Sequence, residues 1–475
     1  MHMATRAGTP IEIDDAAVTE FQAMLHGPLL RPGEPGYDEA RVIFNGMFDR
    51  HPGLIAHCHG TADVMDAVAF ARRHDLLISV RGGGHNVAGN AICDGGLMID
   101  LSQIKGVHVD RTARTVRVQG GATWADVDRE TQAFGLATPG GIVSHTGVAG
   151  LTLNGGIGWL RNKYGLSCDN LVSADVVTAH GDLLTASATE NPDLLWALRG
   201  GGGNFGIVTS FVFTLHPVGP MVAASFPMYP MARTPKVLKQ WRDWVVSTPG
   251  DISSEVVLWT MPAVPELPSA VHGQDVVIPS GVYAGSPDEG LQALQPMREF
   301  GRPLGEITGI LPFRMVQKAF DGFFPNTGEL LSYWKSIYVN TLSDAVIEIL
   351  VDRSVNRSSR STMVVVQHFG HAVRQVPPDA TAFATREAPF IVSFMGTWRA
   401  QSESSTHIAW VRDAWDRLSH HATGAVYLNY LGREEQGAEN LVQAAFGPNY
   451  ARLVAIKAKY DPTNVFRMNH NIRLT

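Results

Sequence analysis

The chain has 475 residues, and 38 Lys and Arg against 45 Asp and Glu give a formal net charge of −7. Hydrophobic residues make up 45% and charged residues 17%, which is typical of a folded chain with more than one domain. The negative charge excludes a general attraction to nucleic acid, and no apolar run approaches the roughly 18 residues of a membrane span. The first ten residues lack the apolar core of a secretion signal, and three scattered cysteines suit a reducing compartment, so we expect a cytoplasmic protein.

Glycine is the unusual residue in this composition. It occurs 48 times, and 24 of these glycines lie between residues 82 and 206. No fixed repeat accompanies them, so the segment is neither collagen-like nor of low complexity. It predicts folded structure in which many backbone positions need a positive φ, or lie very close to another backbone or to a ligand.

The predicted elements of the first half are short and mix helices with strands. A helix over residues 61–77, capped by Thr61 or Asp63, precedes a short strand and a glycine loop. A second helix over 125–134 should end at Gly135. The other predicted strands of this half are residues 97–101, 107–110, 115–119, 174–178 and 207–215.

After residue 217 glycine becomes rarer and aromatic residues accumulate, which indicates a second α+β domain. A helix is predicted near the C-terminus over 449–459. A chain that leaves the first domain and returns would bring this tail beside the glycine-rich half. The middle region is predicted to contain helices at 234–246 and 343–355 and strands at 255–261, 275–283, 363–369 and 390–398.

Three glycine clusters are candidate ligand sites. Residues 81–86 read RGGGHN, and consecutive glycines let successive N–H groups converge on an anion such as phosphate. The cluster matches neither the dinucleotide fingerprint nor the P-loop, and a tight turn with a surface histidine would explain it equally well. Residues 147–158 could be closely packed helix or strand, and 199–208 holds four consecutive glycines. Three such clusters in one domain favour a single large cofactor over flexible turns.

Together these segments resemble the flavin-linked oxidases of the vanillyl-alcohol-oxidase (PCMH-type) fold, in the branch of berberine bridge enzyme and 6-hydroxy-D-nicotine oxidase. The resemblance is close over about residues 40–215 and 425–473 and holds only in pattern between them. The matching segments are RGGGHN (81–86), LNGGIG (153–158), KYGLSCDN (163–170), DLLWALR (193–199), GNFGIV (203–208), YLNY (427–430) and YDPTNVF (460–466).

The resemblance implies an α+β fold of two domains, in which a PCMH-type FAD-binding domain joins an α+β substrate domain whose antiparallel sheet is covered by helices. The expected division is an FAD-binding domain over 1–216 and a substrate-binding domain over 217–422. A C-terminal segment, residues 423–475, is expected to return to the FAD-binding domain.

The resemblance also implies FAD as the cofactor, bonded covalently through its 8α-methyl group to His85. The first glycine loop would wrap the pyrophosphate, the second would lie along the ribityl chain and isoalloxazine, and the third would lie near the adenosine. The further cofactor-binding residues expected on this basis are Arg81, Gly82, Gly83, Gly84, Asn86, Gly89, Thr146, Gly147, Gly150, Asn154, Gly155, Gly156, Gly158, Gly206, Ile207, Val208, Asn469 and Asn471.

One position departs from the family pattern. Many members carry a second flavin link through a cysteine, and Val143 stands at the matching position here. The three cysteines of the chain, Cys58, Cys93 and Cys168, lie elsewhere. We therefore expect a single covalent link through His85, as in the hydroxynicotine-oxidase subgroup.

The resemblance places Tyr427, Asn429 and Tyr430 beside the flavin ring as catalytic candidates. A tyrosine that acts as base near pH 7 needs surroundings that lower its pKa from about 10. On the strand over 363–369, alternation puts Gln367 and Phe369 on one face, and the resemblance favours this face as the substrate roof. No metal is expected.

The expected function is that of an FAD-dependent oxidase of secondary metabolism. It would abstract a hydride from a C–OH or C–N carbon of a small, extended, natural-product-like substrate and reduce O2 to H2O2. A flavin-dependent dehydrogenase with another electron acceptor is the alternative, and a non-catalytic flavin-binding protein is a third hypothesis. The expected partners are therefore the small-molecule substrate and O2, and the sequence does not predict the oligomeric state.

Overall fold

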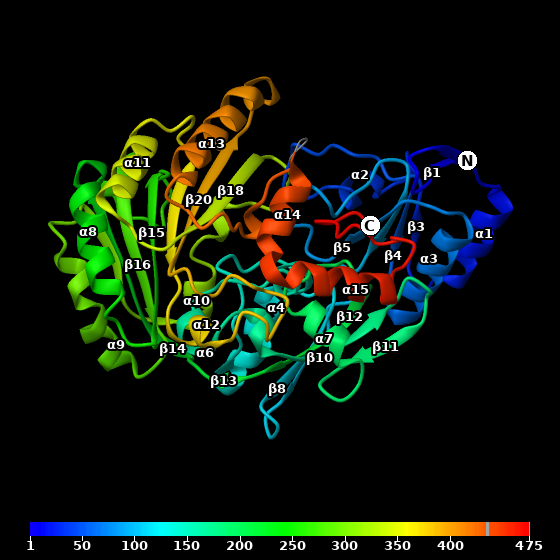
Figure 1. Ribbon diagram of the computed structural model, residues 1–475, viewed down its shortest axis with the longest axis horizontal. Coiled ribbons are helices and arrows are strands. Elements are labelled where there is room, and N and C mark those ends of the chain that lie inside the picture. The colour runs from blue at the N-terminus through cyan, green and yellow to red at the C-terminus, as the bar shows by residue number, and fades with distance from the viewer. Residues whose placement is uncertain (434–436, 475) are drawn as a thin grey trace.

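Sheets of four, five and seven strands carry the architecture of the computed structural model, which describes residues 1–433 and 437–474 (Figure 1). Two small antiparallel pairs accompany them. Those pairs are β1 (His2–Ala4) with β2 (Pro10–Glu12), and β9 (Leu136–Ala137) with β13 (His216–Pro217). No helix of the described residues is both long and apolar enough to cross a bilayer.

The four-stranded sheet near the N-terminus has a parallel core. Its strand order is β3 (Leu29–Leu30), β4 (Leu54–His57), β6 (Leu97–Asp100) and β5 (Ile78–Arg81). The predicted first helix is α3 (Thr61–Arg73), and it packs on this sheet together with α1 (Asp15–Met24). The predicted cap is wrong, because Gly60 precedes the helix and no side chain caps it. The Asp63 carboxylate instead accepts hydrogen bonds from the amides of His26 and His59.

The five-stranded sheet is antiparallel throughout and completes the glycine-rich half. Its order is β11 (Leu183–Ala186), β10 (Leu171–Val177), β12 (Ile207–Thr214), β8 (Thr115–Gln119) and β7 (Val107–Asp110). The predicted helix over 125–134 is confirmed as α4 (Trp124–Thr131) followed by a 3-10 turn, and Gly135 ends it with a φ of +63°. Three further helices of this half are α5 (Val148–Leu153), α6 (Arg161–Tyr164) and α7 (Pro192–Leu198).

The seven-stranded sheet is antiparallel and lies in the middle of the chain. Its order is β17 (Gly305–Pro312), β14 (Met221–Pro230), β16 (Asp275–Tyr283), β15 (Ile252–Thr260), β19 (Met363–His368), β20 (Phe390–Trp398) and β18 (Leu331–Val339). Four helices cover one face: α8 (Thr234–Val245), α9 (Pro287–Leu294), α11 (Asp344–Val355) and α13 (Ser404–Ser419) (Figure 1).

The two faces of this sheet belong to two different cores. Val256 and Val366 point toward the helices and pack with residues such as Trp241. Val257 and Val365 point the other way and pack with residues of the glycine-rich half. All nine residues of β15 are therefore buried, because both faces of the strand are covered.

The C-terminal segment packs against the glycine-rich half of the chain. Helices α14 (Ala438–Phe446) and α15 (Tyr450–Tyr460) lie back over α7, β10 and β12 (Figure 1). A buried ion pair stabilises the end of α15, because the Lys457 ammonium lies 2.6 Å from the Asp461 carboxylate. The same ammonium donates to the carbonyl oxygens of Asn204 and Phe466.

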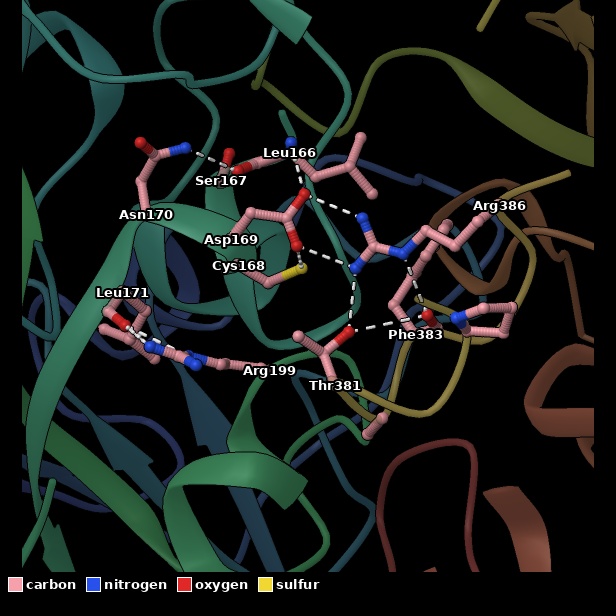
Figure 2. Close-up of polar contacts among 12 residues, drawn as sticks. Leu166, Ser167, Cys168, Asp169, Asn170, Leu171, Arg199, Thr381, Phe383 and Arg386 are labelled. Atoms are coloured by element: carbon pink, nitrogen blue, oxygen red, sulfur yellow. Dashed lines mark hydrogen bonds and ion pairs between the residues drawn. The ribbon is translucent and has the colours of Figure 1, made fainter. Parts of the chain in front are cut away.

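A second buried ion pair joins the glycine-rich half to the middle of the chain (Figure 2). Arg386 donates from two guanidinium nitrogens to the two carboxylate oxygens of Asp169, both at 2.7 Å. The remaining donors of this guanidinium reach the Thr381 hydroxyl at 2.7 Å and the Phe383 carbonyl at 3.1 Å. The pair is shielded from water, so it fixes the loop around residue 383 against the motif at 163–170.

We expect Asp169→Asn to lower the free energy of unfolding by about 3–5 kcal/mol, because Arg386 would remain buried without its counter-charge. Urea unfolding of the flavin-loaded protein, followed by far-UV circular dichroism, measures the change. The control is Glu329→Gln, which breaks an ion pair with Arg399 whose side chains are 59% and 70% exposed. That control should cost at most about 1 kcal/mol. Equal shifts in both variants would contradict the role given to the buried pair.

Candidate functional site

The candidate site is one cavity between the glycine-rich half and the seven-stranded sheet. Including the open solvent at its mouth, it encloses about 1790 Å³. One wall is formed by the three glycine segments and part of the C-terminal tail. The other wall is the sheet. The residues predicted for the cofactor that line this cavity are Gly82, Gly83, Gly84, His85, Asn86, Thr146, Gly147, Gly150, Asn154, Gly206, Ile207, Val208 and Asn469.

Two of the glycine segments touch each other backbone to backbone. A Cβ atom on Gly83 would lie 2.4 Å from the amide nitrogen of Gly147, and a Cβ on Gly147 would lie 2.4 Å from the amide nitrogen of Gly83. These distances are far below van der Waals contact, so neither position can carry a side chain without moving the chain. Glycine is required at both positions by contact within the protein.

Other glycines of the wall face open space. A Cβ on Gly150 or on Gly203 would meet no atom of the described chain within 4 Å, and both residues line the cavity. Gly150 lies within α5, where alanine would fit the helix better than glycine. A glycine that protein packing does not require leaves room for a ligand to approach the backbone.

Six of the predicted cofactor residues lie outside the lining. Gly155, Gly156 and Gly158 are close to the Phe383 ring, the Ser167 side chain and the Gly140 carbonyl respectively, so their Cβ positions are filled by protein. Gly89 is likewise covered by the Phe48 ring. Arg81 turns its guanidinium away to the Ala40 carbonyl. The sixth of these residues is Asn471.

His85 is held in the cavity wall by two rings. The Phe44 ring stacks on its imidazole with 4.3 Å between centroids. Its Nε2 lies 3.1 Å from Nδ1 of His145. Burial lowers the pKa of His85 to about 3, and the neighbouring His145 adds to the shift. The imidazole is therefore neutral near pH 7 and holds a nitrogen lone pair.

The three catalytic candidates of the tail have different positions. Tyr430 and Asn429 line the cavity, whereas Tyr427 lies behind them. The Tyr427 hydroxyl accepts hydrogen bonds from the Gly156 amide at 3.1 Å and from the Asn429 side chain at 2.8 Å. Burial raises the pKa of both tyrosines above the usual range. Both hydroxyls are therefore protonated near pH 7, and the condition that a tyrosine base requires is not met.

The sheet wall contributes an acid that sequence analysis missed. Glu255 on β15 lines the cavity and faces Gln367 on the neighbouring strand β19, in the register that also pairs Val257 with Val365. The Gln367 amide donates to Glu255 Oε2 at 2.8 Å. Alternation along a strand could have placed Glu255 on one face, but the sequence gives no sign that this face is buried.

The predicted roof residues are only partly in place. Gln367 is buried next to Glu255 and does not itself line the cavity. Phe369 follows the end of β19, and its ring packs edge-on against Tyr338 at 5.8 Å, away from the lining. On the same strand, Met363 and Val365 do line the cavity.

None of the three cysteines lines the cavity. Val143 lines the cavity, while Cys58, Cys93 and Cys168 are buried elsewhere. Among residues 1–433 and 437–474, no cluster of three or more His, Cys, Asp or Glu side chains could hold a metal ion.

Comparisons with known proteins match two separate segments of the chain to family models. Residues 52–187 match the family model "FAD binding domain", and residues 426–473 match "Berberine and berberine like". An FAD-linked oxidoreductase of Dictyostelium discoideum is 30% identical over 461 residues, which cover 96% of each chain. The (R)-6-hydroxynicotine oxidase of Paenarthrobacter nicotinovorans is 29% identical over 99% of each chain.

Solved structures share the whole architecture. The crystal structure of 6-hydroxy-D-nicotine oxidase from Arthrobacter nicotinovorans superposes with a TM-score of 0.84 at 27% identity, covering 95% of this chain and 98% of that one. The BBE-like 1 protein of Physcomitrella patens gives a TM-score of 0.86 at 26% identity, over 96% and 99% of the two chains. The predicted PCMH-type α+β fold is therefore confirmed.

The residues of the cavity fit FAD. Its glycine wall offers open backbone at Gly150 and Gly203, which suits a long, partly flat ligand. Two buried polar atoms of the lining, Asn469 Oδ1 and His470 Nε2, have no hydrogen-bond partner among the described residues. Buried polar atoms are nearly always paired, so these atoms are available to polar groups of the cofactor.

Substitution by alanine should have different effects at glycines packed against backbone and at glycines that face open space. Gly83→Ala should destabilise the fold by about 1–3 kcal/mol or more, because the new methyl group meets backbone. Gly150→Ala should leave the flavin-free protein as stable or up to about 1 kcal/mol more stable, because it lies in a helix. The same variant should weaken flavin retention by about tenfold or more.

Thermal melting of flavin-free protein and the ratio of flavin to protein absorbance after purification separate the two effects. The control is Gly309→Ala in β17, where a Cβ would meet open space and the residue lies outside the cavity lining. It should leave the flavin content unchanged and should not lower the melting temperature. Full flavin content in Gly150→Ala would contradict the assignment of Gly150 to the flavin-binding wall.

Proposed function

The chain belongs to the FAD-linked oxidoreductases of the berberine-like family, and we propose that it is an oxidase with one covalent flavin link, through His85. It would oxidise a C–OH or C–N carbon of a small organic substrate and return the electrons to O2 as H2O2. The observation that carries this proposal is the cavity itself, in which a glycine wall suited to FAD faces an apolar sheet wall.

We assign cofactor binding and substrate binding to different walls of the cavity. We assign FAD binding to residues 1–216 and the tail 423–475, and substrate binding to 217–422. FAD, when bound, accepts the two electrons of the reaction as a hydride from the substrate carbon. The chain's own task is to hold the substrate in place, exclude water and receive the proton that leaves its O–H or N–H group.

His85 is suited to a covalent link by its electrostatic surroundings. Burial keeps its pKa at about 3, so the ring is a neutral nucleophile rather than an imidazolium. The stacked Phe44 ring and the nearby His145 restrict how the imidazole can turn. Val143 at the cysteine position supports a single link, because its side chain cannot bond to the flavin.

Asn429 and Tyr430 are the tail residues that we place at the substrate. Both line the cavity, and both can donate a hydrogen bond, since the Tyr430 hydroxyl stays protonated. Tyr427 acts through Asn429, because its hydroxyl accepts a hydrogen bond from the Asn429 side-chain amide at 2.8 Å and so orients it. We assign orientation to these three residues and seek the proton acceptor elsewhere.

His85→Ala should yield a protein that still folds but releases all its flavin on denaturation. The wild-type chain should keep flavin fluorescence in a denaturing gel, because a covalent bond survives unfolding. Intact-mass spectrometry of both proteins provides the measurement, and His74→Ala, a histidine outside the cavity, is the matched control. Flavin that stays with the denatured His85→Ala chain would refute the assigned link.

A peroxide assay on the purified yellow protein tests the oxidase function. We expect H2O2 from at least one member of a panel of aromatic and terpenoid alcohols, cyclic amines and oligosaccharides. The photoreduced enzyme should be reoxidised by air within seconds. Slow reoxidation by O2 together with fast reoxidation by a quinone or dye would replace the oxidase by a dehydrogenase.

A further inference from the structure

The sheet wall of the cavity contains one carboxylate, Glu255. It is the sole acidic residue among the described residues of the lining, and the residue is fully buried in the sheet. No sequence motif marks it, and none of the roles assigned above uses it. A buried acid in a ligand cavity is uncommon, because burial of an unpaired charge is costly.

One oxygen of this carboxylate is without a partner. Oε2 accepts a hydrogen bond from the Gln367 amide at 2.8 Å. Oε1 is also buried, and no described residue donates to it. Since buried polar atoms are nearly always paired, the missing donor at Oε1 is best supplied by a ligand in the cavity.

Arg161 supplies the counter-charge from behind the sheet wall. It is fully buried, and its guanidinium donates to three carbonyl oxygens, those of His368 at 2.9 Å, Gly158 at 2.9 Å and Ser254 at 2.5 Å. Burial raises the pKa of Glu255, and the positive charge of Arg161 opposes part of that rise. One positive and one negative charge are thus balanced, and a ligand with a charge of its own would upset that balance.

Apart from Tyr430, whose phenol interacts with Gln367 and Glu255, the surroundings of Glu255 in the cavity are mainly apolar. Val257 and Val365 flank it on the same face of the sheet. The rest of this part of the lining is Phe320, Phe324, Trp334, Met363 and Met395. A ligand that fits here presents one hydrogen-bond donor to Glu255 and is otherwise mainly apolar or aromatic.

We propose that Glu255 Oε1 receives the reacting O–H or N–H group of an uncharged, mainly apolar alcohol or amine and takes its proton. This inference rests on the proposed function. In the reaction the C–H bond breaks and its electron pair leaves as hydride to FAD. The O–H or N–H bond breaks as its proton moves to Oε1, and a C=O or C=N bond forms. Glu255 then releases this proton to water, which restores its carboxylate.

The first test measures binding, and it needs no turnover. Benzyl alcohol and benzoate are the probes, titrated into flavin-loaded protein and followed by the change in flavin absorbance. Wild type should bind benzyl alcohol about tenfold or more tightly than benzoate, because the benzoate carboxylate would face a like charge. In Glu255→Gln that preference should fall to about threefold or less, since the isosteric amide has no charge.

The matched control is Glu306→Gln, the same change in an edge strand of the same sheet, where Glu306 pairs with Arg298 outside the cavity. It should keep the wild-type preference. The proposal is overturned if Glu255→Gln also keeps that preference, if wild type binds benzoate as well as benzyl alcohol, or if benzyl alcohol does not bind at all.

The second test measures the proton step with the fastest alcohol or amine from the peroxide panel. Anaerobic flavin reduction should be about 10²–10⁴ times slower in Glu255→Gln, while Glu255→Asp, which keeps a carboxylate, should recover part of the rate. Wild-type rates in both variants would overturn the assignment of Glu255. A panel without any oxidised substrate would count against the proposed oxidase instead, and the binding preference would still decide the ligand of Glu255. Should Glu255→Gln fail to fold, Glu255→Leu, which also removes the charge, takes its place in both tests.

Discussion

Contact between two glycine loops is the constraint on which the cavity depends. Gly83 and Gly147 approach so closely that neither tolerates a Cβ atom, and this contact brings the loop of His85 next to the start of α5. Only because the loops touch can they form one continuous wall. The glycines of the chain therefore serve two purposes: some allow backbone to meet backbone, and others, such as Gly150 and Gly203, leave open space in front of the wall.

The second wall must be held at a fixed distance from the first, and buried polar contacts do this. The two-pronged pair of Arg386 and Asp169 joins the walls on one side. The Asp321 carboxylate accepts from the amide and the hydroxyl of Ser144 at 2.7 and 2.6 Å on another. Such contacts depend strongly on orientation, so they restrict sliding of the sheet more than apolar packing alone would. The shape of the cavity is thus a property of both halves together.

The sequence predicted the glycine wall far better than the sheet wall, for a physical reason. Glycine clusters, a terminal αL glycine such as Gly135 and short apolar strands are local signals, and the structure confirms them. Glu255 is the sole charged residue of β15, and its burial depends on which elements cover both faces of the strand. Alternation also misplaced Phe369, because β19 ends at His368 and the chain then turns toward Tyr338. Neither outcome is encoded locally.

This difference has a consequence for how such a fold acquires its substrate. The glycine wall offers mainly backbone to a cofactor, so it constrains residue type through space and φ. Contacts on the sheet wall come from side chains at positions such as 255, 257, 363 and 365, which the strand geometry leaves free to vary. Burial leaves His85 neutral and Tyr430 protonated, so Glu255 is the one described residue of the lining that can bring a negative charge to the substrate, and Arg161 favours its ionised form. A single exchange on β15 would therefore alter which substrates the cavity accepts while the flavin wall stays intact.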